Sequence, residues 1–487
     1  MKSTKTPQLA TAAALVLGTM VATLVFAKAT SQPAMILALV AAAPFLFIAL
    51  RKLPLVVFTA LLFVGNFKTV PAQGISLSDP TLILLLLSAA AIFIELLFMI
   101  SGSTGWTIWR LFAGQWAVVA AFSLLLVCAG ASYLYTTAPV YGLDKLVRLG
   151  CFEVVLFFGP LLLLKDRRGL RHVLRTTVIL ALVLALRDMS RALHPSTGVL
   201  RGETDVTQIG DAMLLAVAIL VCLYYKFEKP FTRPVLWLSI PVLVVGLIAC
   251  AARGPVAALL VTLLVTVWVI RTDTGLLSRR RILLTTIAAV AIAVPSISWI
   301  EHLPGMEKKV EWKEAELDSM FSGSLSSGGT VSQRLSFYQS ALDALAAHPV
   351  LGLGVGGWSM WYYGEDIPRY PHNFILEVAA EEGFLGLAVL GTLLFLLARS
   401  AVRLFRFWPL EFSFLFPGLL FLVIYNSITG DLEARFLWFW AGIIAATCRM
   451  VQAPDPHLAA AMDVEDRLPG LAFRPPRQYL KEAGHYH

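Results

Sequence analysis

Residues 80–100 read PTLILLLLSAAAIFIELLFMI, an apolar stretch in which Glu95 is the single charged side chain. A helix that crosses the hydrocarbon core of a bilayer needs about 20 mostly apolar residues. The stretch therefore predicts a transmembrane helix, and comparable stretches recur along the chain. The candidate spans are 9–27, 34–50, 53–66, 80–100, 112–134, 145–164, 172–190, 209–225, 235–251, 254–270, 282–300, 372–397, 411–429 and 433–450.

The composition of the chain agrees with a membrane protein. Of its 487 residues, 58% are hydrophobic and 14% are charged, whereas charged residues make up about 25% of an ordinary soluble domain. The net charge of +8 would suit a nucleic-acid partner, but the basic residues gather in short loops between apolar runs, as membrane topology requires. We predict an all-α polytopic membrane protein with about 12–14 transmembrane helices and no nucleic-acid partner.

The basic loops predict the orientation of the chain. Lys165–Arg171, Arg271–Arg281 and Arg399–Arg406 all fall on one side when the candidate spans alternate in direction. Loops rich in Lys and Arg stay in the cytoplasm, so both ends of the chain are expected there as well. The expected divisions are helices 1–11 at 1–300, an outer loop at 301–371, helices 12–14 at 372–450 and a polar cytoplasmic tail at 451–487.

The outer loop is expected to contain a short helix and an aromatic patch. Apolar residues recur at three- and four-residue spacing over 332–348, which predicts a helix with one apolar face. The residues of that face are Leu335, Tyr338, Leu342 and Leu345, and Pro349 follows the helix. After the glycine-rich run 352–357, the aromatic patch consists of Trp358, Trp361, Tyr362 and Tyr363.

Several charged side chains lie at the outer ends of spans or in the outer loop, although a charge at mid-bilayer costs about 2.5–3.5 kcal/mol. They are Lys145, Arg148, Arg187, Arg191, Arg201, Arg253, Arg334, Asp431, Glu433 and Arg435. Solvated loop positions would explain Arg201 and Arg334, and snorkelling to the headgroups would explain Arg148. Arg253 has apolar spans on both sides, so an ion pair with Asp431 or Glu433 is the structural alternative for it.

Taken together, several arginines on the outer side suggest a diphosphate or another polyanionic ligand. A guanidinium group offers a planar fork that matches phosphate oxygens and stays charged at all relevant pH values. The sequence gives little support for a metal site. The acidic pairs Glu203/Asp205 and Glu365/Asp366 have no histidines at ligand spacing, and the five cysteines lack paired spacing and are interpreted as small core residues.

His372 lies in the sequence PHNFILE of residues 371–377. Pro371 and Asn373 are typical of a helix start, so His372 is expected in the first turn of a helix at the outer membrane surface. A local hydrogen bond at the helix start is the structural interpretation, and proton transfer is the functional one.

Three segments together resemble the O-antigen ligase and Wzy-type polymerase superfamily of bacterial envelope glycosyltransferases. The first is SQRLSFYQSAL at 332–342 followed by HPVLGLG at 348–354, the second is PHNFILE at 371–377 followed by EGFLG at 382–386, and the third is the turn at 252–254. The stretch 330–390 carries most of the resemblance. There are two departures from the family's pattern: Ala252 stands where the family often has Ser, and Gln208 and Asp211 stand in the region where it often has Asn.

The resemblance implies transfer of a glycan from undecaprenyl diphosphate to an acceptor sugar hydroxyl at the periplasmic face of the bacterial inner membrane. It implies an inverting enzyme without metal or cofactor, with His372 as the general base and Arg253, Arg148, Arg201 and Arg334 as ligands of the diphosphate. Asn373, Glu377, Asp431 and Lys145 are expected to support this site. The implied partners are the lipid-linked donor, a glycan or lipid A-core acceptor, membrane lipids and a chain-length-regulating co-polymerase.

Ligase and polymerase activity both remain open, and the span number slightly favours a polymerase. A transporter or flippase for the same lipid would also place arginines in a cavity, but its sequence would be expected to show inverted halves and charges near the midplane. If the protein were a non-catalytic scaffold of an envelope complex, His372 and Arg253 would have no functional explanation.

Overall fold

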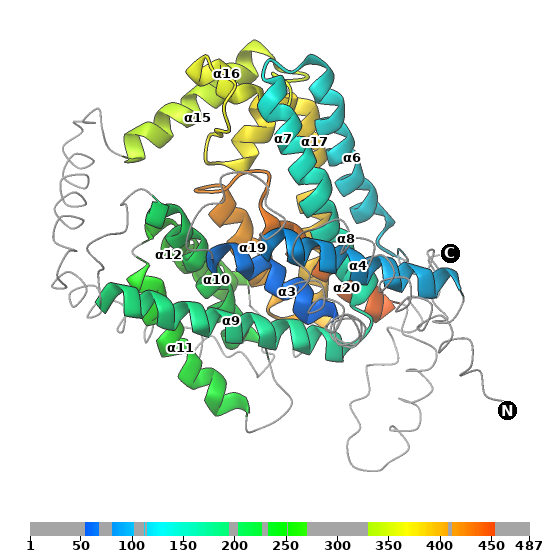
Figure 1. The fold of residues 1–487 in the computed structure, drawn as a ribbon, viewed down its shortest axis with the longest axis vertical. Coiled ribbons are helices and arrows are strands. Elements are labelled where there is room, and N and C mark those ends of the chain that lie inside the picture. The colour runs from blue at the N-terminus through cyan, green and yellow to red at the C-terminus, as the bar shows by residue number, and fades with distance from the viewer. Residues whose placement is uncertain are drawn as a thin grey trace, which may run out of the picture.

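The computed structural model describes residues 54–67, 80–101, 112, 114–193, 203–225, 232–250, 252–269, 330–407 and 412–452. Every regular element in this part of the chain is a helix, as Figure 1 shows. Five of these elements are long and apolar enough to cross a membrane, and five shorter apolar helices accompany them. The all-α membrane class is therefore confirmed, whereas the predicted spans at 9–27, 34–50 and 282–300, together with the tail, lie outside the described residues.

The helices follow the apolar runs of the sequence closely. Their bounds are α3 (Pro54–Val64) with η1 (Gly65–Phe67), α4 (Pro80–Ile100), α6 (Trp116–Ser132) with η2 (Tyr133–Tyr135), α7 (Pro139–Arg148), η3 (Leu149–Glu153), α8 (Val154–Leu163), α9 (Arg167–Leu193), α10 (Glu203–Tyr224), α11 (Thr232–Ala249), α12 (Arg253–Val269), α15 (Thr330–Ala347), α16 (Gly357–Tyr363), α17 (Phe374–Phe407), α19 (Leu415–Asn426) and α20 (Arg435–Gln452). The π-helical turn η3 joins α7 to α8, so Pro139–Leu163 forms one continuous span.

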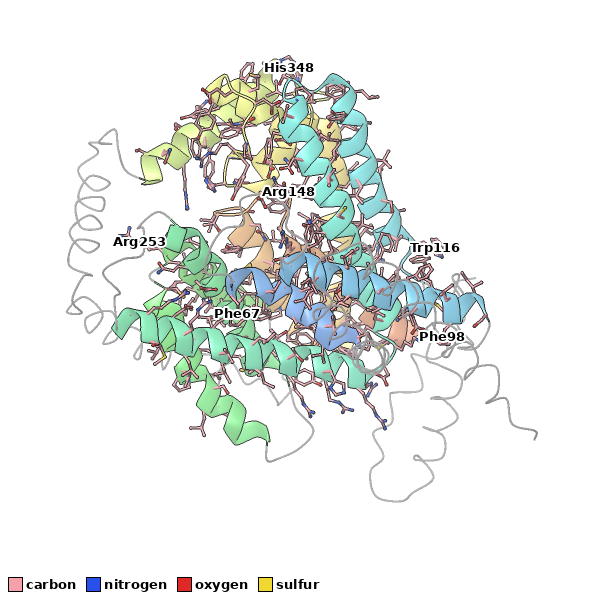
Figure 2. The ribbon with its side chains drawn as sticks, viewed as in Figure 1. Phe67, Phe98, Trp116, Arg148, Arg253 and His348 are labelled. Carbon is pink, nitrogen blue, oxygen red and sulfur yellow. The ribbon has the colours of Figure 1, made fainter. Side chains whose placement is uncertain are left out.

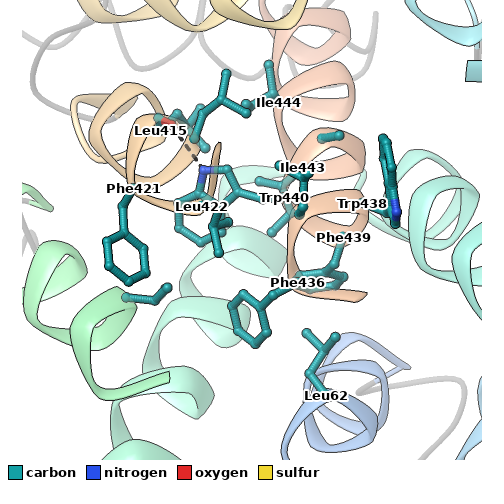
Figure 3. Close-up of a cluster of buried hydrophobic side chains, with 14 of the residues drawn as sticks. Leu62, Leu415, Phe421, Leu422, Phe436, Trp438, Phe439, Trp440, Ile443 and Ile444 are labelled. Carbon is teal, nitrogen blue, oxygen red and sulfur yellow. Dashed lines mark hydrogen bonds between the residues drawn. The ribbon is translucent and has the colours of Figure 1, made fainter. Parts of the chain in front are cut away.

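In Figure 1, α15 and α16 lie at the top of the molecule, over the upper end of α17. The helices α6 and α7 run beside α17, and α9 crosses the lower half with α11 beneath it. The aromatic core lies between α3, α6, α8, α19 and α20, where Phe122 of α6 stacks on Phe157 of α8 with ring centroids 4.0 Å apart. Figure 3 shows part of this core, including the bond of 3.0 Å that Trp440 Nε1 donates to the Leu415 carbonyl.

Side-chain contacts show which helix ends lie together. At one end, Asn66 after α3 donates to Asp211 near the start of α10, at 2.8 Å, and Arg187 near the end of α9 pairs with the same carboxylate. At the other end, the buried guanidinium of Arg449 in α20 donates to the carbonyls of Leu161 and Leu164 at the end of α8. These groupings agree with the alternating span directions that the basic loops predict.

Helix α17 is broken at Gly383, although the sequence predicted a single helix through this point. Gly383 has φ 64° and ψ −156°, which no helical residue adopts. The chain before α17 supplies the missing backbone partners: Phe384 N–H donates to the Pro349 carbonyl at 2.8 Å, and Leu353 N–H donates to the Ala380 carbonyl at 2.9 Å. The glycine-rich run therefore packs directly against the break.

The short helix of the outer loop is confirmed as α15, and part of its predicted apolar face is exposed. Leu335 and Leu342 are exposed, whereas Phe337, Ala341 and Ala344 form the face that packs on α16 and α17. Both sets have helical spacing, and small residues at 341 and 344 allow the close approach of the neighbouring helices.

All five cysteines are free. Cys222, Cys250 and Cys448 are buried, as expected for small core residues, and Cys128 is half-buried. Cys151 is exposed on the outside of the helix bundle, so the core interpretation is wrong for that residue.

Candidate functional site

The loop between α19 and α20, residues 427–434, contacts elements from four distant parts of the sequence. Arg148, at the end of α7, donates to Glu433 at 3.0 Å and also pairs with Asp144 one turn earlier. The start of α12 approaches so closely that a Cβ on Gly254 would lie 2.8 Å from Cγ2 of Thr429. Figure 2 shows Arg148 near the centre of the molecule and Arg253 at the upper end of α12.

His372 also contacts this loop. Its side chain forms a hydrogen bond to the backbone of Thr429, and the hydroxyl of Tyr338 in α15 donates to the Ile428 carbonyl at 3.3 Å. The bond to Thr429 raises the pKa of His372, as expected when an imidazole N–H is the donor. The second ring nitrogen of the neutral imidazole then carries the lone pair that can accept a proton.

The surroundings of His372 favour the neutral imidazole. Burial is the main cause that lowers its pKa, and the positive charges of Arg334 and Arg369 lower it further. The ring of Phe337 stacks on His372 at 5.9 Å, and Tyr370 meets it edge-on at 4.7 Å. The imidazole thus lies between two aromatic rings, with the positive charges of Arg334 and Arg369 nearby.

His372 lies before the helix rather than in its first turn, where the sequence had placed it. Its φ of 58° is the left-handed conformation, and α17 begins only at Phe374. Asn373 is the cap, because its Oδ1 accepts hydrogen bonds from the N–H groups of Ile375 and Leu376 at 3.0 and 3.2 Å. The left-handed conformation turns the histidine away from the direction that the helix would impose.

A buried ion cluster lies one turn into α17. Lys145 of α7 is fully buried and contacts both Glu377 and Glu381, which lie on the same face of α17 at i, i+4 spacing. The second oxygen of Glu377 accepts the Leu432 N–H at 2.7 Å. Glu377 therefore joins α7 and α17 to the 427–434 loop, and removal of one partner would leave an unpaired buried charge.

Two acidic residues have roles that the sequence did not predict. The carboxylate of Asp366 accepts hydrogen bonds from the N–H groups of Val140 and Tyr141 at 2.8 and 2.9 Å, so it caps the start of α7 instead of being a solvated loop residue. Asp431 is half-buried, and desolvation together with the neighbouring carboxylates of Glu377 and Glu433 raises its pKa to about 8.

Comparison with known proteins adds the decisive observation. Residues 234–391 match the family model described as O-antigen ligase. The chain contains an O-antigen ligase domain. The resemblance to the ligase and polymerase superfamily is thereby confirmed, and no curated protein matches the chain.

The O-antigen ligase domain begins in α11 and ends in α17, so Arg253, Arg334 and His372 lie inside it. Lys145 and Arg148 precede the domain, and the 427–434 loop follows it. The match supports a function of the O-antigen ligase or polymerase type in general terms, which implies an enzyme that transfers a glycosyl group. Glu377 and His372, inside the matched region, contact the 427–434 loop that follows it, and Lys145, which precedes it, pairs with Glu377.

The structure brings together most, but not all, of the residues that the sequence predicted. His372 and Arg334 are neighbours, Lys145 and Glu377 are paired, and Arg148 reaches the same loop as His372. Arg253 is exposed at the start of α12, Glu433 pairs with Arg148, and Arg201 lies outside the described residues. Within the described part of the chain, no group of three or more His, Cys, Asp or Glu side chains could hold a metal ion.

Sequence reasoning missed Glu381, Asp366 and Arg369. Glu381 could have been found from its i, i+4 spacing to Glu377, because that spacing places both carboxylates on one helix face. No local signal identifies Asp366 as a helix cap, since its partner helix lies more than 200 residues earlier in the chain.

Proposed function

We propose that this protein transfers a glycan from undecaprenyl diphosphate to an acceptor sugar hydroxyl at the periplasmic face of the bacterial inner membrane. The observation that carries the proposal is the meeting of His372, Arg334 and Arg148 around the 427–434 loop, inside and next to an O-antigen ligase domain. A base beside cationic groups suits the attack of a hydroxyl on a diphosphate-linked sugar.

His372 is the general base in this proposal. A sugar hydroxyl becomes a good nucleophile when its proton is removed as the new bond forms. The lowered pKa of His372 keeps the imidazole neutral at physiological pH, and the bond to Thr429 leaves one ring nitrogen to accept the proton. Direct displacement by this route inverts the anomeric configuration.

The arginines bind the diphosphate and stabilise the negative charge that grows on it as the sugar leaves. A fixed guanidinium stabilises this charge more in the transition state than in the ground state, and it can do so without a metal ion. Arg148 uses part of its five N–H donors for Asp144 and Glu433, so the remaining donors can bind phosphate oxygens. Arg253, Arg334 and Arg201 are the further ligands.

The proposed orientation of the site follows from the contacts that show which helix ends lie on the same side of the bundle. The end with Arg148, Arg253 and His372 is opposite to the end where Lys165 pairs with Glu95 and Arg449 caps α8. Because the strongly basic segment 165–171 belongs in the cytoplasm, the site faces the periplasm and both ends of the chain are cytoplasmic.

The acceptor is the lipid A core in a ligase and another lipid-linked repeat unit in a polymerase, and in the second case a chain-length-regulating co-polymerase is a partner. Purified protein incubated with lipid-linked glycan and each acceptor distinguishes the two by product size. One transfer gives a single added unit, whereas polymerisation gives a ladder.

The substitution His372→Gln tests the catalytic assignment in the same assay. Gln keeps a hydrogen bond but cannot take the proton, so turnover falls about 10²–10⁴-fold if His372 is the base. His348→Gln is the matched control, because His348 is an exposed histidine of the same outer region. If His372→Gln kept more than about a tenth of the wild-type rate, the residue would orient the acceptor rather than deprotonate it.

A further inference from the structure

The aromatic patch of the outer region forms a continuous group of rings that ends at His372. Phe337 in α15 is the centre of this group, because it contacts Trp358, Tyr362 and His372 with centroid distances of 5.4, 5.0 and 5.9 Å. Tyr362 and Tyr363 meet edge to face at 4.8 Å. The rings therefore lead from the base to the surface of the protein without a gap.

The inner and outer rings of this group differ in exposure. Phe337 and Trp358 are buried and belong to the small core between α15, α16 and α17. Tyr362 is half-buried with its ring stacked on Trp358 at 5.3 Å, and Tyr363 is 38% exposed. Two tyrosines packed against buried rings thus present part of their own rings to the outside, and Phe337 connects them to His372.

Polar groups surround the exposed part of the rings. The hydroxyls of Ser336 and Tyr362 lie 3.0 Å apart, and the exposed Arg369 is close enough to act electrostatically on both Tyr363 and His372. A sugar ring has an apolar face of C–H groups and a rim of hydroxyls. Aromatic rings with a few fixed hydrogen-bonding groups match both parts of such a ligand.

We propose that Tyr362, Tyr363 and Ser336 form a subsite for the sugar of the acceptor that precedes the attacking hydroxyl, with Arg369 at its rim. This inference rests on the proposed function, because it takes the acceptor to approach from the side of His372. The rings reach His372 through Phe337, whereas Arg148 and Arg253 belong to α7 and α12, and Arg334 is the one diphosphate ligand that shares α15 with Ser336. Uncharged aromatic faces suit the C–H face of a sugar rather than a phosphate, so the subsite serves the acceptor glycan.

The test measures sugar binding without lipid or diphosphate, so that the arginines contribute nothing to the signal. The probes are the delipidated core oligosaccharide and the repeat-unit oligosaccharide, titrated into the full-length protein in detergent and followed by saturation-transfer NMR. Tyr363→Ala should raise the Kd of the bound probe about three- to tenfold, the loss expected for one aromatic contact. Tyr363→Trp should restore binding, because it restores an aromatic face.

Trp361→Ala is the matched control, because Trp361 is a similarly exposed aromatic of the same helix that meets His348 instead of the Phe337 group. It should leave the Kd unchanged. Failure of both probes to bind the wild type, or equal Kd values for wild type and Tyr363→Ala, would overturn the subsite. Binding that depends on Tyr363 in a protein that transfers no glycan would instead support the subsite and contradict the proposed function.

Discussion

The break in α17 leads to a sharp prediction for the substitution Gly383→Ala. At φ 64° and ψ −156°, the backbone of Gly383 has a conformation that is essentially restricted to glycine. A Cβ at this position would also lie 2.6 Å from the carbonyl carbon and oxygen of Val350. The substitution therefore introduces backbone strain and a steric clash at the same place.

Both effects have known magnitudes. The strained conformation costs about 1–3 kcal/mol, and an overpacked contact costs about 1–3 kcal/mol. The lower chain entropy of the unfolded alanine variant offsets about 0.4–1 kcal/mol. We therefore expect Gly383→Ala to lower the free energy of unfolding by about 1–6 kcal/mol.

The assay is unfolding by SDS in mixed micelles, followed by tryptophan fluorescence. Gly391→Ala is the matched control, because Gly391 lies in the same helix and a Cβ there meets no atom within 4 Å. Its expected effect is neutral or stabilising by up to about 1 kcal/mol, since alanine is the better helix former. Equal stability of the two variants would show that α17 has no break that requires glycine.

The remaining predictions concern the site and the orientation of the chain. Because burial and Arg334 lower the pKa of His372, the acid limb of kcat/KM, which reports on the free enzyme, should lie below about 6.5, and Arg334→Gln should move it upward; a limb that stays in place would contradict this coupling. Arg253→Lys keeps the charge but loses the two-pronged fork, so it should lose most of the activity in a glycan-transfer assay while the protein remains folded, and near-normal turnover would remove Arg253 from the site. Activity should persist in excess chelator, whereas loss of turnover that magnesium or manganese restores would show a metal requirement. A cysteine at Gly364 should react with a membrane-impermeant thiol reagent from the periplasm and one at Leu277 should not; the reverse pattern would invert the topology.

The helix bounds could be predicted from the sequence because lipid selects long apolar runs directly. The stretch 80–100 coincides with α4 to the residue. The break at Gly383 could not be predicted, because the flanking residues favour a helix and the backbone partners Pro349 and Val350 lie more than 30 residues earlier. A local pattern carries no information on bonds that only the folded chain makes.

The residues of the candidate site also fall into two groups, those that the sequence could predict and those that it could not. His372, Arg148 and Arg334 could be found because charged or titratable side chains at span ends are rare enough to stand out. The contact of Lys145 with Glu377 joins residues 232 positions apart, and only the packing of α7 on α17 brings it about. The sequence also could not predict which residues of α15 are buried, because two sets of residues have helical spacing and the neighbouring helices decide which set is buried.

The backbone bonds across the break also constrain how the protein is assembled in the bilayer. A broken helix exposes N–H and C=O groups, and each unsatisfied group costs several kcal/mol in hydrocarbon. The carbonyls of Pro349 and Val350 satisfy the N–H groups of Phe384 and Leu385. The 349–350 segment and the part of α17 after Gly383 must therefore reach their final positions together, because neither satisfies its backbone groups without the other.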